Sequence, residues 1–172
     1  RIGDFAAVER HAQLLHEPGV FTAPAALFNR LPRAANDWRD TTLIDFRGVN
    51  LTRLEVRSAG HGFAIEVDQT NRVFALTKPT PARADAGKVD LLVRTLAAAQ
   101  VTAFINDNPR ADLEPYGLQP PEAEFAAGVG TNDLLVVQFG KSPTNDPASV
   151  YARRLAQTNI VLVSMELLDF LQ

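Results

Sequence analysis

The chain has 172 residues, of which 46% are hydrophobic, enough for the core of one domain or of one domain with part of a neighbour. The net charge of −3 excludes the strongly basic surface of a typical nucleic-acid-binding domain, so we expect no nucleic-acid partner. The absence of cysteine excludes disulfides, thiolate metal ligands and cysteine nucleophiles.

No apolar run in the sequence approaches the roughly 20 residues that a membrane-spanning helix needs. The chain begins at Arg1 and its only methionine is Met165. We therefore expect it to be part of a longer protein, in which a signal or a membrane anchor can lie upstream.

Alternating apolar residues predict three strands in the first half of the chain. Residues 52–56 and 63–67 alternate, and the Gly-His-Gly of residues 60–62 predicts the turn of a hairpin between them. Residues 73–76 predict a third strand, which Pro79 ends because proline cannot donate to a sheet.

An amphipathic helix is predicted directly after Asp85, which has the side chain of a good N-cap. Val89, Leu92, Val93 and Leu96 follow at helical spacing and form one apolar stripe. We expect this stripe to face the inward residues of the first hairpin: Leu54, Val56, Phe63, Ile65 and Val67.

The second half of the chain predicts further short strands separated by turn residues. The expected elements are a strand at residues 101–106, a positive φ at Gly117, a hairpin of residues 122–129 and 134–139 with its turn at 130–133, a strand pair at 150–155 and 160–164, and a helix at 165–171. The whole pattern predicts an α+β fold: a mostly antiparallel sheet with one main amphipathic helix packed on it.

Residues 20–31 align without gaps with residues 160–171. In both segments four β-prone residues precede a short helical stretch with two adjacent large apolar residues. The similarity is either a coincidence or the trace of a repeated module. Accordingly, residues 1–33 are expected to be the end of a preceding repeat or an N-terminal strand and helix, and residues 34–172 the main α+β module.

The sequence predicts no metal site, because His11 and His16 lie five residues apart and miss the spacing that places two imidazoles on one helix face. His61 lies in the predicted turn. Gly128-Val129-Gly130 is too short for a phosphate cradle and no helix pattern follows it, so no nucleotide cofactor is expected.

Two groups of carboxylates leave a hydrolase possible, since glycosidases use two carboxyl groups in one cleft. The residues are Glu122 and Glu124, expected on one strand face, and Asp107, Asp112 and Glu114, clustered around a loop. A solvated strand face and turn caps explain the same residues. We therefore predict no catalytic residue.

Three aromatic residues form the candidate binding surface for a glycan or a peptide: Trp38, Tyr116 and Tyr151. Serine hydrolase chemistry is not indicated, since the sequence has no Gly-x-Ser-x-Gly elbow.

Several short motifs, in this order, resemble a bacterial family called domain of unknown function 4340. They are Trp38 with Leu43-Ile44-Asp45-Phe46, Leu76-Thr77-Lys78-Pro79, Ala84-Asp85, Tyr116-Gly117-Leu118 with Pro121, and Tyr151-Ala152-Arg153. The resemblance covers roughly residues 38–171. One departure is Phe74, where the family often has tryptophan.

The resemblance implies the extracytoplasmic part of a bacterial envelope protein, on the periplasmic side of the inner membrane and anchored by a segment outside this chain. Family members look like companions of ABC-type transport systems of the gliding-motility kind, and repeated modules are usual. No catalytic residues are established for the family. We therefore expect a non-enzymatic binding or scaffolding module with a protein partner in a membrane transport assembly. The alternatives are a glycan- or peptide-binding module and a carboxylate-dependent hydrolase.

Overall fold

The computed structural model describes residues 9–58, 60–68, 70–71 and 73–171. It divides into two compact units, Arg1–Asp40 and Thr41–Gln172, which are described separately below. The expected division of the chain into residues 1–33 and 34–172 as folding modules remains a prediction.

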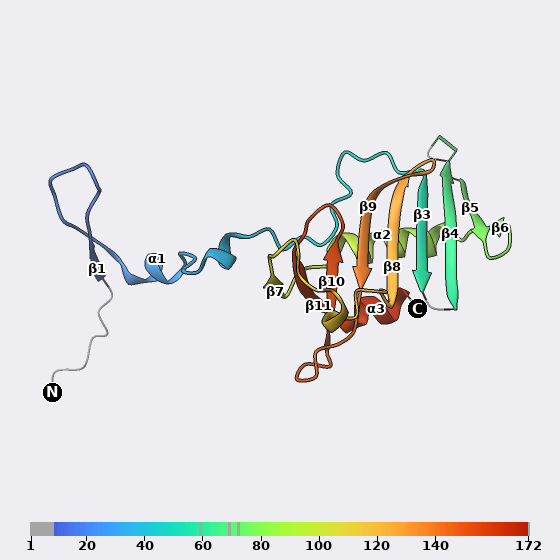
Figure 1. The fold of residues 1–172 in the computed structure, drawn as a ribbon. Helices are drawn as coiled ribbons and strands as arrows, with labels where there is room; N and C mark the ends of the chain where they lie inside the picture. The colour runs from blue at the N-terminus through green and yellow to red at the C-terminus, as the bar shows by residue number, and fades with distance from the viewer. Residues whose placement is uncertain (1–8, 59, 69, 72, 172) are drawn as a thin grey trace, which may run out of the picture. The chain divides into compact units, whose positions relative to one another are not determined.

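The second unit contains one antiparallel sheet with the strand order β6-β5-β4-β3-β8-β9-β10-β11-β7 (Figure 1). Its strands are β3 Arg53–Ser58, β4 His61–Asp68, β5 Val73–Lys78, β6 Ala82–Arg83, β7 Ala103–Asn106, β8 Ala123–Val129, β9 Asn132–Phe139, β10 Ser149–Arg154 and β11 Ile160–Ser164. The helices are α2 Ala86–Ala98 and α3 Met165–Leu171, with a 3-10 turn η2 at Glu114–Tyr116. The predicted α+β architecture is confirmed.

Helix α2 begins where the sequence predicts it. The Asp85 carboxylate accepts hydrogen bonds from the backbone N–H groups of Gly87 (2.8 Å) and Lys88 (3.2 Å), which have no partner within the helix. Of the predicted apolar stripe, Leu92 and Leu96 are buried and belong to the core of the unit, as Val89 does, while Val93 is partly buried.

Both helices lie on the same face of the sheet. Leu54 of β3 lines one hollow together with residues of α2. Val56, the next inward residue of β3, lines a second hollow together with Leu171 of α3. The loop before β3 adds Phe46, whose ring meets Phe125 of β8 edge-on with centroids 6.3 Å apart. The core therefore forms between this face, the two helices and the loop.

The predicted hairpin turns are too long. His61 and Gly62 belong to β4, and the chain reverses beside Gly60, which has φ 88°. Likewise β9 already begins at Asn132, after Gly130 with φ 57°. In both places only two residues separate the strands, and one of them is a glycine in the left-handed region, so the strands extend further into the predicted turn segments than composition suggests.

Other predicted boundaries differ by a few residues. The strand predicted at residues 101–106 begins only at Ala103, because the N–H of Val101 is bonded to the carbonyl of Thr41. Strand β6 was not predicted. Gly117 has the predicted positive φ, 67°, and the last strand pair and α3 lie where the sequence places them. No helix among the described residues is long and apolar enough to cross a membrane.

The first unit contains a small antiparallel hairpin of β1 Glu9–Ala12 and β2 Phe21–Pro24. A short helix α1, Ala25–Asn29, follows directly, and a 3-10 turn η1 at Ala35–Trp38 comes later. The similarity between residues 20–31 and 160–171 therefore corresponds to a real structural parallel, since both segments are a strand that runs directly into a helix.

Candidate functional site: the open face of the sheet

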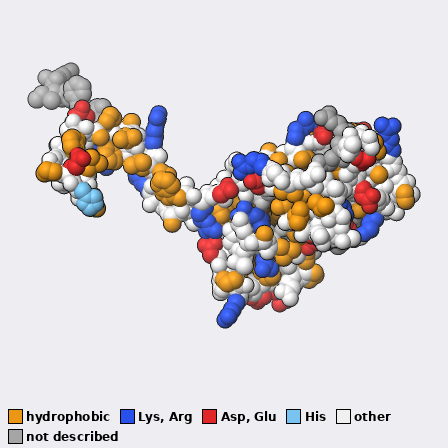
Figure 2. Space-filling model, turned by 90° about the horizontal axis from the view of Figure 1, so that it is seen from above, with side chains coloured by type: hydrophobic (Ala, Val, Ile, Leu, Met, Phe, Trp, Pro, Cys, Tyr) orange, Lys and Arg blue, Asp and Glu red, His pale blue; other side chains and the backbone are white. Residues whose placement is uncertain are grey.

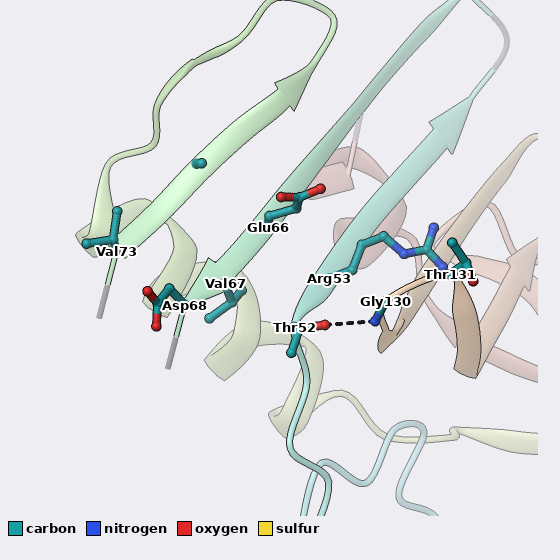
Figure 3. Close-up of a pocket in the computed structure, with 9 residues that line it drawn as sticks. Thr52, Arg53, Glu66, Val67, Asp68, Val73, Gly130 and Thr131 are labelled. Atoms are coloured by element: carbon teal, nitrogen blue, oxygen red, sulfur yellow. Dashed lines mark hydrogen bonds between the residues drawn. The ribbon is translucent and has the colours of Figure 1, made fainter. Parts of the chain in front are cut away.

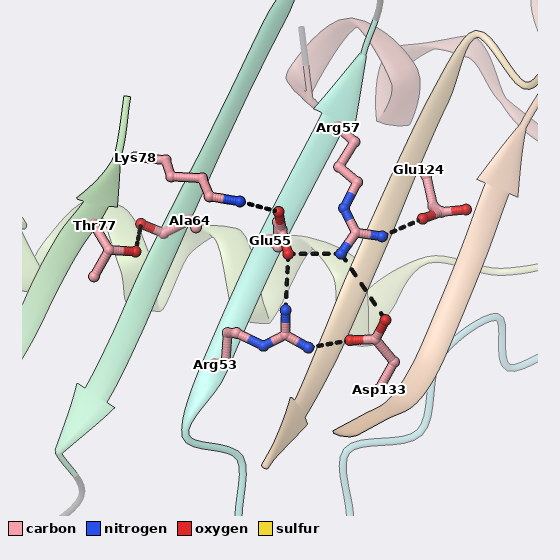
Figure 4. A network of polar contacts seen from close by, with 8 residues as sticks. All are labelled: Arg53, Glu55, Arg57, Ala64, Thr77, Lys78, Glu124 and Asp133. Atoms are coloured by element: carbon pink, nitrogen blue, oxygen red, sulfur yellow. Dashed lines mark hydrogen bonds and ion pairs between the residues drawn. The ribbon is translucent and has the colours of Figure 1, made fainter. Parts of the chain in front are cut away.

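The face of the sheet opposite α2 and α3 carries charged side chains on β3, β5, β8 and β9, and we call this face the open face (Figure 4). Strand alternation places Leu54 and Val56 toward the helices, and therefore Arg53, Glu55 and Arg57 on the open face. With Lys78, Glu124 and Asp133 these residues form what we call the ion-pair cluster.

Glu55 lies at the centre of the ion-pair cluster, and the residue is only 6% exposed. Its carboxylate accepts hydrogen bonds from Arg57 (2.7 Å), Arg53 (2.8 Å) and Lys78 (3.1 Å). A carboxylate buried to this degree requires such partners, because desolvation of an unpaired charge costs several kcal/mol.

The two arginines also pair with carboxylates on the neighbouring hairpin. Arg57 donates to Glu124 at 2.7 Å, and Arg53 contacts Asp133. Glu124 accepts a further hydrogen bond from the side-chain amide of Gln138 at 3.0 Å. Three cations and three carboxylates from the four strands β3, β5, β8 and β9 thus meet, and the cluster carries no net charge.

The cluster shifts the pKa values of its central pair in opposite directions. The hydrogen bond from Arg57, with further help from Lys78, lowers the pKa of Glu55 to about 2 against the opposing effect of burial. The same carboxylate, followed by Glu124, raises the pKa of Arg57. The pair is therefore fully charged at neutral pH and has no tendency to exchange protons there.

A hollow of ≈ 690 Å³ lies at one end of the open face, between β4, β5 and the β8–β9 turn (Figure 3). Glu66 and Asp68 of β4 and Thr131 of the turn border it. The turn is held to β3 by the hydrogen bond from the Gly130 N–H to the Thr52 hydroxyl, 2.9 Å. The hollow is open to solvent, which suits contact with a partner surface better than enclosure of a small ligand.

Of the three aromatic residues predicted as a binding surface, the structure brings two together. Tyr116 at the end of η2 and Tyr151 of β10 meet edge-to-face, with ring centroids 4.9 Å apart and planes at 81°. Both are partly buried, and the Tyr116 hydroxyl is bonded to the Asn106 amide at 3.3 Å. Trp38 belongs to the first unit, where it is 72% exposed.

Structural contacts are seen for Glu124 and Asp112, two of the carboxylates that left a hydrolase possible. Glu124 belongs to the ion-pair cluster, Glu122 precedes β8 and is exposed, and Asp112 accepts the backbone N–H of Glu114 at 3.1 Å. Asp107 is exposed. Within the described part of the chain, no group of three or more histidine and acidic residues could hold a metal ion.

The pKa values of the Asp37, Asp45, Glu55 and Asp68 carboxyl groups are clearly lowered. In each case the largest cause is a hydrogen bond donated to the carboxylate: from Ala34 to Asp37, from Arg47 to Asp45, from Arg57 to Glu55 and from Asn71 to Asp68. A carboxyl group that acts as a general acid needs the opposite, a raised pKa.

The ion-pair cluster is the feature that the sequence reasoning missed. Its signal was present as Arg53-x-Glu55-x-Arg57, because residues two apart on a strand share a face and opposite charges there stabilise one another. The prediction used only Leu54 and Val56, which define the buried face, and not the charged residues that alternate with them.

A family model described as Domain of unknown function (DUF4340) matches residues 1–108 and, a second time, residues 75–172. Together the two matches cover every residue, and a second match within one chain indicates a repeated domain. No curated protein and no solved structure matches the chain.

Proposed function

Because this chain belongs to the family described as Domain of unknown function (DUF4340), we propose that it acts as a non-enzymatic binding or scaffolding module. The module contacts a protein partner in a membrane transport assembly of the ABC type, on the periplasmic side of a bacterial inner membrane. A segment outside this chain anchors it to the membrane. This setting rests on the family resemblance of the motifs around Trp38, Leu76 and Tyr116.

The observation that carries the proposal is the closed ion-pair cluster on the open face. Its three cations pair with its three carboxylates, and its central carboxylate is held ionised. A reaction centre needs a group whose proton or lone pair is available to a substrate. A polar sheet face with satisfied charges instead suits recognition of a partner's surface, where electrostatic complementarity sets specificity.

The test compares two charge reversals in the full-length protein. Glu66→Lys alters an exposed position beside the hollow on the open face, and Asp90→Lys makes the same change on an exposed position of α2. After cross-linking and purification from membranes, we expect Glu66→Lys to lose a transporter subunit that the wild type and Asp90→Lys retain.

Two results would contradict this proposal. The first is a full-length protein that fractionates with the cytoplasm and captures no transport component. The second is equal capture by both variants, which would remove the open face as the contact surface.

A glycan- or peptide-binding role is the second candidate, favoured by the contact between Tyr116 and Tyr151. A ligand that stacks on the pair stabilises the folded state and raises the melting temperature. A screen of glycans and peptides by thermal shift, repeated with Tyr151→Leu, distinguishes this role: it requires a shift in the wild type that the variant loses. The carboxylate-dependent hydrolase has the least support, since Glu124 is paired with Arg57 in the ion-pair cluster and Asp112 accepts a backbone hydrogen bond in a turn.

A further inference from the structure

The hairpin and helix of the first unit repeat the end of the second unit in structure and in register. β1 and β2 pair from Glu9↔Pro24 to Ala12↔Phe21. Adding 140 to each residue number gives pairs that β10 and β11 form, Ser149↔Ser164 to Ala152↔Val161. The same offset relates the first residues of α1 and α3, Ala25 and Met165.

The two copies differ in what covers them. In the second unit the apolar residues Val161, Leu167 and Leu171 are 0%, 6% and 4% exposed. Their counterparts in the first unit, Phe21, Leu27 and Leu31, are 50%, 53% and 50% exposed. Apolar side chains accordingly cover much of the visible surface of this unit in Figure 2.

The second unit also shows which neighbours such a hairpin takes. β10 pairs with β9 and β11 pairs with β7, so the hairpin sits inside the sheet, with α3 packed on it and on the common core. Among the described residues, β1 and β2 pair only with each other. Both outer edges of this hairpin therefore present backbone groups that a central hairpin would have paired.

We propose that residues 9–31 are the closing hairpin and helix of another body of this fold. They insert between its equivalents of β9 and β7, with Phe21, Leu27 and Leu31 against its core. The partner of this surface is thus a second module of the same family. In that module residues 9–31 fill the place that residues 149–171 fill in the second unit. Two matches of one family model within the chain agree with this arrangement, which is independent of the proposed function.

At one paired position a charged residue replaces a fully buried apolar one. Arg10 stands where the second unit has the fully buried Val150. An arginine can keep its aliphatic stem against apolar neighbours while its guanidinium reaches solvent, so this substitution is compatible with the same docking.

A fusion protein tests the insertion directly. Residues 41–140 of a second copy are joined to the N-terminus of the full chain, so that residue 1 follows at the position of residue 141. In this protein the hairpin can close the added body. We expect amide hydrogen exchange in β1 and β2 to be slower by at least about 100-fold than in the 172-residue chain, because strands paired inside a sheet open rarely.

Two controls sharpen the result. A fusion with residues 41–172 in place of 41–140 already has its closing hairpin, so residues 9–31 should exchange as fast as in the single chain. In the first fusion, Leu27→Asp should abolish the slow exchange, whereas Leu91→Asp on α2 should not, although the two leucines are similarly exposed. Equally fast exchange in all the proteins would overturn the proposal. An added body that stays unfolded would overturn it too, since the hairpin would have failed to complete it.

Discussion

Replacing Glu55 by glutamine removes an anion that Arg53, Arg57 and Lys78 share while nearly preserving the shape of the side chain. The hydrogen bond from Arg57, the largest cause, lowers the pKa of Glu55 from 4.5 to about 2 in the folded protein. Because each factor of ten in acid dissociation is worth about 1.4 kcal/mol, the ionised form stabilises the fold by at most about 3.5 kcal/mol.

The expected loss at neutral pH is smaller than this limit. The side chains of Lys78 and Arg57 are 66% and 45% exposed, so water replaces part of what they lose, and each arginine keeps a second carboxylate partner. We expect Glu55→Gln to lower the free energy of unfolding by about 2 kcal/mol.

The stability difference between wild type and Glu55→Gln should depend on pH in a definite direction. A carboxyl group whose pKa is lowered on folding contributes stability above its unfolded value, near 4.5, and loses it as the pH falls toward about 2. The difference between wild type and Glu55→Gln should therefore shrink steadily over this range. Urea denaturation at neutral pH and at several acidic pH values measures it.

Glu66→Gln is the matched control, because Glu66 is exposed on the neighbouring strand of the same face. It should change stability by less than about 0.5 kcal/mol. Equal stability of Glu55→Gln and wild type at neutral pH would refute the reasoning. So would a difference that does not diminish in acid.

Three further substitutions test the fold, each by urea denaturation. Leu96→Ala should cost about 2–5 kcal/mol, since this α2 residue is 0% exposed and its truncation leaves a cavity. Asp85→Ala should cost about 1 kcal/mol by removing the helix cap, and serine at the same position should restore most of it. Gly140→Ala should destabilise by about 2 kcal/mol or more and weaken the near-ultraviolet signal of the tyrosine pair, because its Cβ would lie 2.1 Å from the Tyr116 carbonyl oxygen.

Helix α2 could be predicted from sequence because its determinants are local. Asp85 caps the first turn, and Leu92 and Leu96 recur at helical spacing within a few residues. The hairpins could be predicted for the same reason, since each joins two adjacent alternating segments. The predicted turns are longer than the observed ones because a two-residue turn that contains a glycine with positive φ needs fewer residues than the run of turn-prone residues in each segment.

The partners of Arg53, Glu55 and Arg57 on the open face could not be predicted because they are distant in sequence. Lys78, Glu124 and Asp133 lie 23, 67 and 80 residues from the cluster residues that they contact. Alternation along β3 shows that Glu55 and its neighbours point away from the core. It does not show that β8, rather than some other strand, lies beside them.

The two faces of the sheet contribute differently to the free energy of unfolding, and this decides where function can be tested without unfolding the protein. The helix-covered face contains the apolar core, so its substitutions report on stability. On the open face the cost of a change falls as exposure rises, from Glu55 at 7% for the side chain to Arg57 at 45% and Lys78 at 66%. The proposed recognition of a partner through this face can therefore be tested at an exposed position such as Glu66 at little cost in stability. A substitution at Glu55 would perturb binding and folding together, so loss of the partner there would not show which of the two had changed.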